Sequence, residues 1–393
     1  MKTITDIEGV FADGCHCGIK AEEKLDLAYI SVPNAVAVAG VFTQNQFVAP
    51  SVVFTRQRVQ NDTLRHILVN SGNANVGNGE VGDLANLDIA REGANLFACS
   101  IDDVGVASTG KIAKKIDLDP FKKGVSVFES RGFQRNGSAA AQAILTTDLV
   151  SKEVFVSREI GGQVISVAGI GKGSGMIKPD MATTLSYFAT DIDITHLPLQ
   201  TIFRRASDRS LNMVSVDNDT STSDMSILFA TGAKKIWLTP KNLAEFEALV
   251  TEAMQEMAKM IARDGEGARC LVEVAVSGAA SEMDARTVAL NVVNSPLVKT
   301  AIHGADPNWG RILAAACKNP RVRLNPDTIE LKLNGILLFA NGEQVGANHT
   351  QLVAELKKDT IVLALELNSG AASASAWGCD LGYGYIDINV TYT

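Results

Sequence analysis

A glycine-rich stretch followed by two threonines is the part of this sequence best suited to chemistry. Residues 169–191 read Gly-Ile-Gly-Lys-Gly-Ser-Gly-Met-Ile-Lys-Pro-Asp-Met-Ala-Thr-Thr-Leu-Ser-Tyr-Phe-Ala-Thr-Asp. Its four glycines allow left-handed or cramped backbone that a Cβ would forbid, so we expect something to approach this backbone closely. Thr183 and Thr184 then place two hydroxyls where a loop enters an apolar strand, Thr184 to Ala189. Reactive residues often occupy such loop ends.

The glycines do not form a nucleotide-binding motif. A Walker A loop requires Gly, four residues and then Gly-Lys-Ser/Thr, whereas Lys172 lies between glycines in a different register. The Rossmann fingerprint also fails, because Pro179 stops the helix that would receive a pyrophosphate. The stretch therefore favours another chemistry.

Covalent catalysis by threonine is the alternative that the residues support. A neutral hydroxyl is a poor nucleophile and needs a base beside it. If the bond between Ala182 and Thr183 were cut, Thr183 would gain an α-amino group with a pKa of about 7.7 to 8.0, able to take the proton of its own Oγ. None of the five histidines lies in a recognised catalytic motif. Thr183 is thus predicted to be both nucleophile and base.

A candidate for stabilising an oxyanion lies earlier in the chain. Residues 102–110 read as a strand that ends in Thr109 and Gly110. A hydroxyl next to a glycine N–H can provide the two donors that a developing oxyanion needs.

The elements that must position these residues indicate an α/β protein. Val164 to Ile170 reads as the strand that leads into the glycine stretch. Residues 27–43 read as two strands that are joined by a tight turn and open a sheet. The clearest helix is 245–263, with one apolar stripe. In the second half, Asn334-Gly335 predicts a hairpin, and Tyr383 to Thr391 reads as a final strand.

Length and composition limit the classes to which this protein can belong. At 393 residues, 46% hydrophobic and 20% charged, the chain is expected to form a globular protein with two cores or one large core and a lobe. Neither a membrane-length apolar run nor an apolar signal core is present, which predicts a cytoplasmic location and no membrane partner. A net charge of −8 with isolated basic doublets argues against nucleic acid.

Cysteine usage does not indicate a metal site. Cys15-His16-Cys17 has a metal-like spacing, but adjacent residues of an extended chain point to opposite faces. No second Cys/His pair lies near enough in sequence to complete a tetrahedral site, so we expect reduced cysteines and no metal.

Taken together, the motifs resemble those of the ornithine acetyltransferases, also called glutamate N-acetyltransferases, of cyclic arginine biosynthesis. The resemblance covers essentially the whole chain. It rests on residues 70–75 (Asn-Ser-Gly-Asn-Ala-Asn), 107–110 (Ala-Ser-Thr-Gly), 146–148 (Thr-Thr-Asp), 172–177 (Lys-Gly-Ser-Gly-Met-Ile), 181–183 (Met-Ala-Thr), 219–224 (Asp-Thr-Ser-Thr-Ser-Asp), 264–268 (Asp-Gly-Glu-Gly-Ala), 306–311 (Asp-Pro-Asn-Trp-Gly-Arg) and 377–380 (Trp-Gly-Cys-Asp).

The resemblance implies a self-cleaving enzyme. The cut between Ala182 and Thr183 would give an α chain of residues 1–182 and a β chain of residues 183–393, associated as α2β2. Thr183 would accept the acetyl group of N-acetylornithine and pass it to glutamate in a ping-pong reaction. The implied fold is a layered α/β sandwich of sheets covered by helices, N-terminal-nucleophile-like, with a smaller C-terminal α/β lobe from about residue 280.

The same resemblance implies the site residues and no cofactor. Thr109 and Gly110 would form the oxyanion hole. Lys172 would suit an α-carboxylate and Glu266 an ammonium group. The other substrate ligands would be Thr146 or Thr147, Thr183, Asn389 and Thr393.

Two departures from the family leave alternatives open. Position 184 is Thr where the family commonly has Met, so a second hydroxyl competes with Thr183, although the Ala-Thr junction favours Thr183. The tail after Asn389 is one residue shorter than the family pattern, which leaves the contact of Thr393 with substrate open.

Two rival functions also remain. An N-terminal-nucleophile amidase or aminopeptidase could use the same cut and oxyanion hole but give the acyl group to water. A non-catalytic binding role would leave the Ala182–Thr183 bond intact. Acetyl-CoA is a second candidate donor, which would make the enzyme bifunctional, and no separate CoA-binding signature accompanies it.

Overall fold

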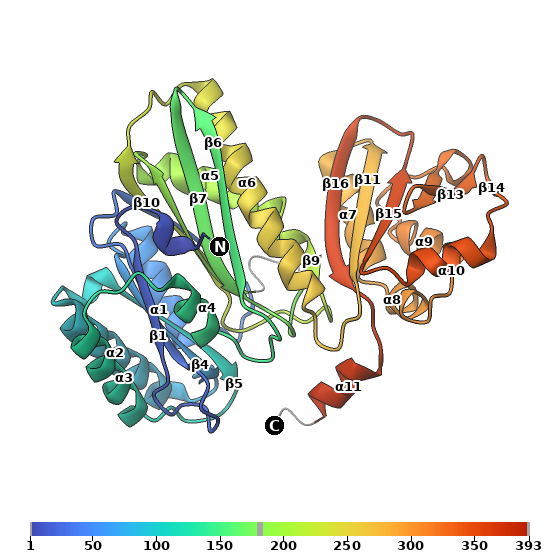
Figure 1. The fold of residues 1–393 in the computed structure, drawn as a ribbon. Helices are drawn as coiled ribbons and strands as arrows, with labels where there is room; N and C mark the ends of the chain where they lie inside the picture. Colours follow the sequence, from blue (N-terminus) through green and yellow to red (C-terminus); the bar gives the residue numbers. More distant parts are fainter. Residues whose placement is uncertain (1, 179–183, 391–393) are drawn as a thin grey trace. The chain divides into compact units, whose positions relative to one another are not determined.

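Two compact units make up the chain. The computed structural model describes residues 2–178 and 184–390 (Figure 1). The first unit takes its residues from Met1–Gly173, Asp180–Asn212 and Thr220–Met257, and the second from Ser174–Pro179, Met213–Asp219 and Ala258–Thr393. The lobe expected from about residue 280 lies inside the second unit, whose longest segment begins at Ala258. The division into two chains after residue 182 stays a prediction.

The first unit contains two sheets. A four-stranded sheet has the order β1-β2-β4-β5, with β1 (Phe11–Cys15), β2 (Leu27–Ser31), β4 (His66–Asn73) and β5 (Val104–Lys111). A five-stranded sheet has the order β3-β10-β8-β7-β6, with β3 (Ala37–Phe42), β6 (Lys152–Ile160), β7 (Gln163–Lys172), β8 (Leu185–Ile192) and β10 (Met225–Lys234).

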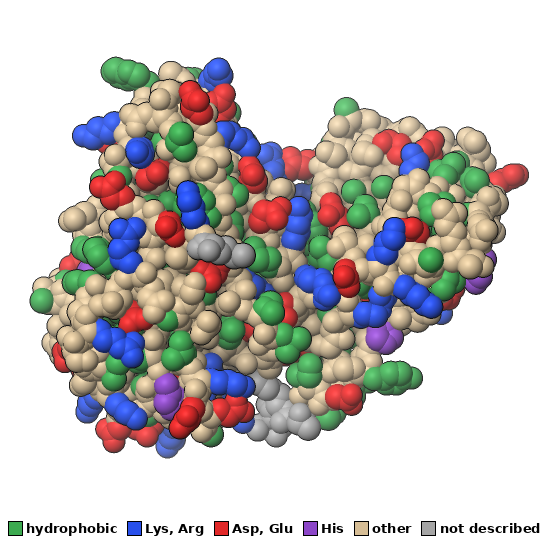
Figure 2. All heavy atoms as spheres, in the orientation of Figure 1, with side chains coloured by type: hydrophobic (Ala, Val, Ile, Leu, Met, Phe, Trp, Pro, Cys, Tyr) green, Lys and Arg blue, Asp and Glu red, His purple; other side chains and the backbone are tan. Residues whose placement is uncertain are grey.

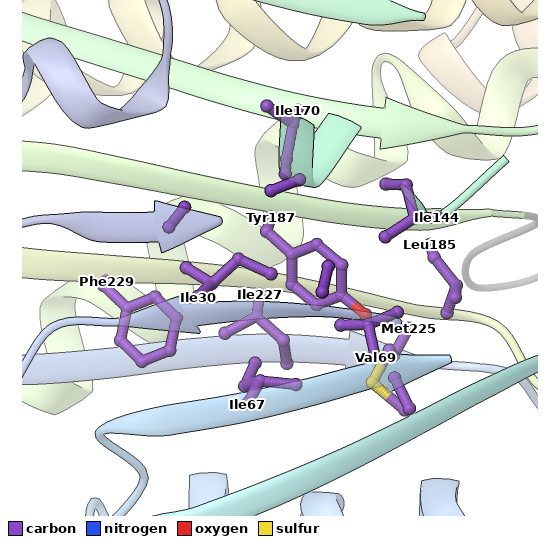
Figure 3. Packing of buried hydrophobic residues seen from close by; sticks show 14 of the residues in the cluster. Ile30, Ile67, Val69, Ile144, Ile170, Leu185, Tyr187, Met225, Ile227 and Phe229 are labelled. Carbon is purple, nitrogen blue, oxygen red and sulfur yellow. The ribbon is translucent and has the colours of Figure 1, made fainter. Parts of the chain in front are cut away.

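The main core of this unit lies between the two sheets. In Figure 3, Ile67 and Val69 from β4 face Tyr187 of β8 and Ile227 of β10, and all four side chains are buried. Fully burying an aliphatic side chain of this size stabilises the fold by about 1.5–3 kcal/mol. β4 pairs with β5, and β8 pairs with β7. The core between the sheets therefore lies beside the strands that carry Thr109 and Lys172.

Helices cover the outer faces of both sheets. On the four-stranded sheet, α2 (Gly79–Phe97) and α3 (Asp119–Arg131) bury Phe97, Phe121 and Phe128. On the five-stranded sheet, Phe203 of α5 (His196–Asp208) meets Phe188 of β8 edge to face, at 6.2 Å between ring centroids. The remaining helices are α1 (Pro50–Gln60), α4 (Gly137–Ala143) and α6 (Pro240–Arg263). The expected layered α/β arrangement is confirmed.

The second unit is built on a seven-stranded sheet of order β14-β13-β12-β15-β11-β16-β9. Its strands are β9 (Val214–Ser215), β11 (Leu271–Ala279), β12 (Glu330–Leu333), β13 (Ile336–Ala340), β14 (Glu343–Gln344), β15 (Thr360–Glu366) and β16 (Ala372–Cys379). Its helices are α7 (Glu282–Val293), α8 (Pro296–His303), α9 (Trp309–Ala316), α10 (His349–Leu356) and α11 (Tyr383–Asn389). The predicted hairpin is confirmed: Asn334 and Gly335 join β12 to β13 with φ of 45° and 85°.

Two expectations about secondary structure are wrong. Residues 27–43 form two strands, but β2 and β3 belong to different sheets, because β2 pairs with β1 and β4 whereas β3 pairs with β10. Tyr383 to Thr391 was expected as a strand, whereas Tyr383–Asn389 forms helix α11. Its alternating apolar pattern indicated a strand, but tertiary contacts decide, since the backbone N of Tyr385 approaches Gly267 too closely for a Cβ there.

The surface shows no segregation of charge on the face drawn in Figure 2, where acidic and basic side chains are interspersed. Within residues 2–178 and 184–390, none of the helices combines the length and apolarity that crossing a bilayer requires.

Candidate active site

Thr109 and Gly110 lie at the end of β5, where it runs parallel to β4. Gly110 pairs with Gly72 in the ladder, and its φ is 126°. A Cβ on Gly110 would lie 2.5 Å from the carbonyl carbon of Gly72, so only glycine fits this strand end. The two strands therefore hold the Thr109 hydroxyl and the neighbouring glycine backbone in fixed positions.

Lys172 ends β7 and brings two of the predicted site residues together. Its Nζ donates to the hydroxyls of Thr109 at 3.2 Å and Thr146 at 3.1 Å. Thr147 is half-buried and is not among the partners that Lys172 has in the described residues. Because the Thr109 oxygen accepts from an ammonium group, its own proton remains free to be donated to a ligand.

Asp148 is a site residue that the sequence did not reveal. Its carboxylate accepts hydrogen bonds from Lys152 Nζ at 2.7 Å, from Gly173 N at 2.7 Å and from Thr146 N at 3.0 Å. The side chains of Asp148 and Lys152 are both fully buried. One carboxylate thus ties the segment that carries Thr146 to the residue after Lys172.

Electrostatics keep Asp148 charged. Burial favours its neutral form, but Lys172 and then Lys152 outweigh this effect and lower the pKa of Asp148 to about 2. The motif Thr146-Thr-Asp148 and the spacing from Asp148 to Lys152 were visible in the sequence. Only the fold shows that Asp148 lies near enough to Lys172 for its charge to lower the pKa of Asp148.

A second buried carboxyl, Asp224, precedes β10. Burial raises the pKa of Asp224 well above its ordinary value, and a hydrogen bond from Ser221 and the charge of Lys172 offset this only in part. A raised pKa favours the neutral form of Asp224, which cancels less of the positive charge of Lys172 than a carboxylate would.

The glycine-rich stretch uses its glycines to accommodate closely packed side chains. We expected left-handed or cramped backbone here, and none of Gly169, Gly171, Gly173 and Gly175 has a positive φ, so the left-handed alternative is not adopted. The expected close approach is present: a Cβ would lie 2.4 Å from Phe188 Cδ1 at Gly169 and 2.5 Å from Met257 Sδ at Gly171. These glycines make room for side chains that pack on β7.

Glu266 and Asn389 belong to the second unit and contact each other. Asn389 Nδ2 donates to Glu266 Oε2 at 2.8 Å and to the backbone carbonyl of Tyr385, one turn earlier in α11, at 2.9 Å. Glu266 is 8% exposed, and a Cβ on Gly175 would lie 2.4 Å from its carboxylate. This pair places a carboxylate and an amide side by side.

Ala182, Thr183 and Thr393 lie outside the described residues. Thr184 is the first described residue after them, and its side chain is buried, with no hydrogen-bond partner for Oγ1 in the described chain. Strand register connects this point to the other site residues, because Leu185 of β8 pairs with Lys172 of β7.

Cys15, His16 and Cys17 do not surround a common point for a metal. Both cysteines are buried, and the backbone N of Cys17 and His16 Nδ1 lie 2.7 Å and 3.4 Å from the carboxylate of Asp26. Across the part of the chain that the structure describes, no group of three His, Cys, Asp or Glu residues could hold a metal ion.

Comparison with known proteins identifies relatives along the whole chain. Residues 11–393 match the model of the ArgJ family. The "Arginine biosynthesis bifunctional protein ArgJ" of Dehalococcoides mccartyi is 39% identical over 396 residues, covering 100% of this chain and 97% of that protein. A crystal structure of the Bacillus halodurans protein of the same description is 39% identical with a TM-score of 0.48, over 51% of this chain and 94% of that one. A crystal structure of an ornithine acetyltransferase of Mycobacterium tuberculosis, complexed with ornithine, is 32% identical with a TM-score of 0.41. The match covers 46% of this chain and 96% of that one.

Proposed function

Because the chain belongs to the ArgJ family, we propose that it serves arginine biosynthesis by transferring an acetyl group from N-acetylornithine to glutamate through an ester on Thr183. The observation that carries this proposal is the contact of Lys172 with Thr109 and Thr146, opposite the start of β8. Thr183 precedes Leu185 by two residues in the sequence, and Leu185 pairs with Lys172 in the sheet.

The chemistry requires cleavage first. Once the Ala182–Thr183 bond is cut, the α-amine of Thr183 takes the Oγ proton as Oγ attacks the acetyl carbonyl of N-acetylornithine. The carbonyl oxygen becomes negative and is stabilised by the Thr109 hydroxyl and the Gly110 N–H. The amine of Thr183 then returns its proton to the departing ornithine nitrogen, which leaves an acetyl ester. Attack by the amine of glutamate repeats these steps and releases N-acetylglutamate.

Substrate recognition is assigned by charge. Lys172 binds the α-carboxylate, and Thr146 contributes its hydroxyl, favoured over Thr147 by its hydrogen bond to Lys172. In the second unit, Glu266 binds an ammonium group and Asn389 orients that carboxylate. Thr393 is the remaining ligand of the proposal.

Acceptor choice separates the proposal from its hydrolase rival. Glutamate should accelerate loss of the acetyl group from the enzyme, measured after N-acetylornithine has been consumed and ornithine removed. A rate that does not depend on glutamate would favour an amidase that uses water. Supplying labelled acetyl-CoA in place of N-acetylornithine tests it as a second donor.

Fragment analysis tests the cleavage. Purified protein should separate under denaturing conditions into chains of residues 1–182 and 183–393, the second beginning Thr-Thr-Leu-Ser. Under native conditions we propose an α2β2 assembly, checked by its mass in solution. A cytoplasmic location stays a prediction.

The oxyanion role of Thr109 predicts a selective kinetic loss. Thr109→Ala should lower kcat by about a hundredfold to a thousandfold, or about 3–4 kcal/mol of transition-state stabilisation, because one donor to the developing charge disappears. Thr109→Ser retains the hydroxyl and is the matched control. An unchanged kcat in Thr109→Ala would remove this residue from the oxyanion hole.

A further inference from the structure

The loop of residues 16–26 is organised by one buried carboxylate. Asp26, whose side chain is fully buried, accepts from the backbone N atoms of Cys17 at 2.7 Å, Gly18 at 3.1 Å and Lys20 at 3.0 Å. These bonds fix the loop backbone, and with it the position from which Lys20 extends.

Lys20 lies between the two segments of the candidate site in the first unit. A Cβ on Gly72 would be 3.2 Å from Lys20 Cγ, and Gly72 is the ladder partner of Gly110. The Nζ of Lys20 donates to the carbonyl of Leu145 at 2.7 Å, immediately before Thr146, and to that of Leu25 at 3.0 Å. Its side chain thus runs from the edge of the oxyanion pair to the segment that contacts Lys172.

The ammonium group of Lys20 has an unused donor. Two of its three N–H groups bind carbonyls, and no other described residue accepts from Nζ. Burial lowers the pKa of Lys20 to about 8; Asp26 and Asp148 oppose this shift, and Lys24 and Lys172 add to it. The other titratable groups on its loop are His16, Cys17, Glu22 and Glu23.

We propose that Lys20 binds the side-chain carboxylate of the acceptor glutamate and thereby sets acceptor specificity, an assignment that rests on the proposed function. Glutamate carries two carboxylates, and Lys172 accounts for one of them. A half-buried ammonium with a free N–H beside the same segment is suited to the other, since such charge-assisted hydrogen bonds are the strong ones.

The same nitrogen tolerates the donor substrate, whose side chain ends in an ammonium group. A neutral Lys20 keeps two N–H groups, which bind the carbonyls of Leu25 and Leu145. Its lone pair then takes the place of the third N–H group and can accept from the ammonium group of the donor. It then releases its proton to solvent when N-acetylornithine binds and regains one when glutamate replaces ornithine.

A comparison of two acceptors tests this role. Glutamine has the length of glutamate but a neutral side chain, so both share every other step. In Lys20→Met, the kcat/KM for glutamate relative to glutamine should fall about ten- to a hundredfold, the scale of a hydrogen bond between charged groups. Ornithine release from N-acetylornithine, measured in the same variant, reports the donor step separately from the acceptor ratio. Lys24→Met, on the same loop with a 70% exposed side chain, is the matched control and should leave the ratio unchanged.

The pH dependence of the wild-type ratio provides a second measurement that needs no variant. Raising the pH through about 8 removes the charge of Lys20, so the preference for glutamate should fall there and should be flat in Lys20→Met. Equal losses for glutamate and glutamine, or a wild-type ratio independent of pH, would overturn this role. A wild-type enzyme that acetylates neither acceptor would overturn the proposed function as well.

Discussion

Thr183→Ala should leave the protein as a single chain of 41.7 kDa and abolish acetyl transfer. In the proposed mechanism the Thr183 hydroxyl attacks both the Ala182 carbonyl and the acetyl group, and cleavage frees the α-amine that acts as base, so the variant would lack both groups. Loss of a covalent nucleophile costs activity by about a millionfold, so the rate should fall to background. Denaturing electrophoresis and ornithine release measure the two effects.

Thr184→Ala is the matched control, because it removes the neighbouring hydroxyl. The Thr184 side chain is buried, and its backbone carbonyl accepts from Met225 N at 3.0 Å, a bond that alanine retains. This variant should still cleave and still transfer acetyl groups. If Thr184→Ala blocked cleavage and Thr183→Ala did not, the nucleophile would be Thr184 and not Thr183.

Asp148→Asn should lower the free energy of unfolding by about 3–5 kcal/mol, because it neutralises a buried carboxylate that lies 2.7 Å from the ammonium of Lys152. Urea denaturation of the purified enzyme measures this. The double variant Asp148→Asn with Lys152→Met removes both charges and should recover much of the lost stability. A single variant as stable as wild type would contradict the account of the ion pair.

The contribution of Asp148 to the free energy of unfolding should decrease at low pH. The pKa of Asp148 falls from 3.8 to about 2 on folding, so its contribution to stability is fully present above pH 3.8 and is lost as the pH falls toward 2. The shift corresponds to about 2 kcal/mol. In Asp148→Asn the acid-induced decrease of stability should be smaller by this amount.

Local sequence patterns predicted much of the fold because local forces determine those elements. The apolar stripe of 245–263 predicted most of α6, and Asn334-Gly335 predicted the β12–β13 turn, where both residues adopt positive φ. Pairing between distant strands was not predictable in this way. The separation of β2 and β3 into two sheets depends on which partners are available, and the pattern of each strand is the same in either case.

The candidate site could be predicted only for residues whose types suggest chemistry by themselves. Thr109 and Lys172 were expected from motif and resemblance, and the fold brings them within hydrogen-bonding distance. Asp148 also contacts Lys152 four residues away, but its contact with Gly173 and that of Lys20 with Leu145 join distant segments, which local spacing does not reveal. The predicted strand at 383–391 failed for the same reason: Gly267 and Glu266, more than a hundred residues earlier, contact α11.

The position of β8 in its sheet has a consequence for the proposed cleavage. Its start is held on one side by Lys172 of β7 and on the other by Met225 N, which binds the carbonyl of Thr184. A new amino terminus at Thr183 would therefore be joined by one peptide unit, about 3.8 Å between Cα atoms, to Thr184, which directly precedes β8 and whose carbonyl accepts from Met225 N. Cutting a chain usually releases an end that diffuses. Here the sheet would retain it, so the base and nucleophile would keep a high effective concentration relative to the bound substrate without any further element to hold them.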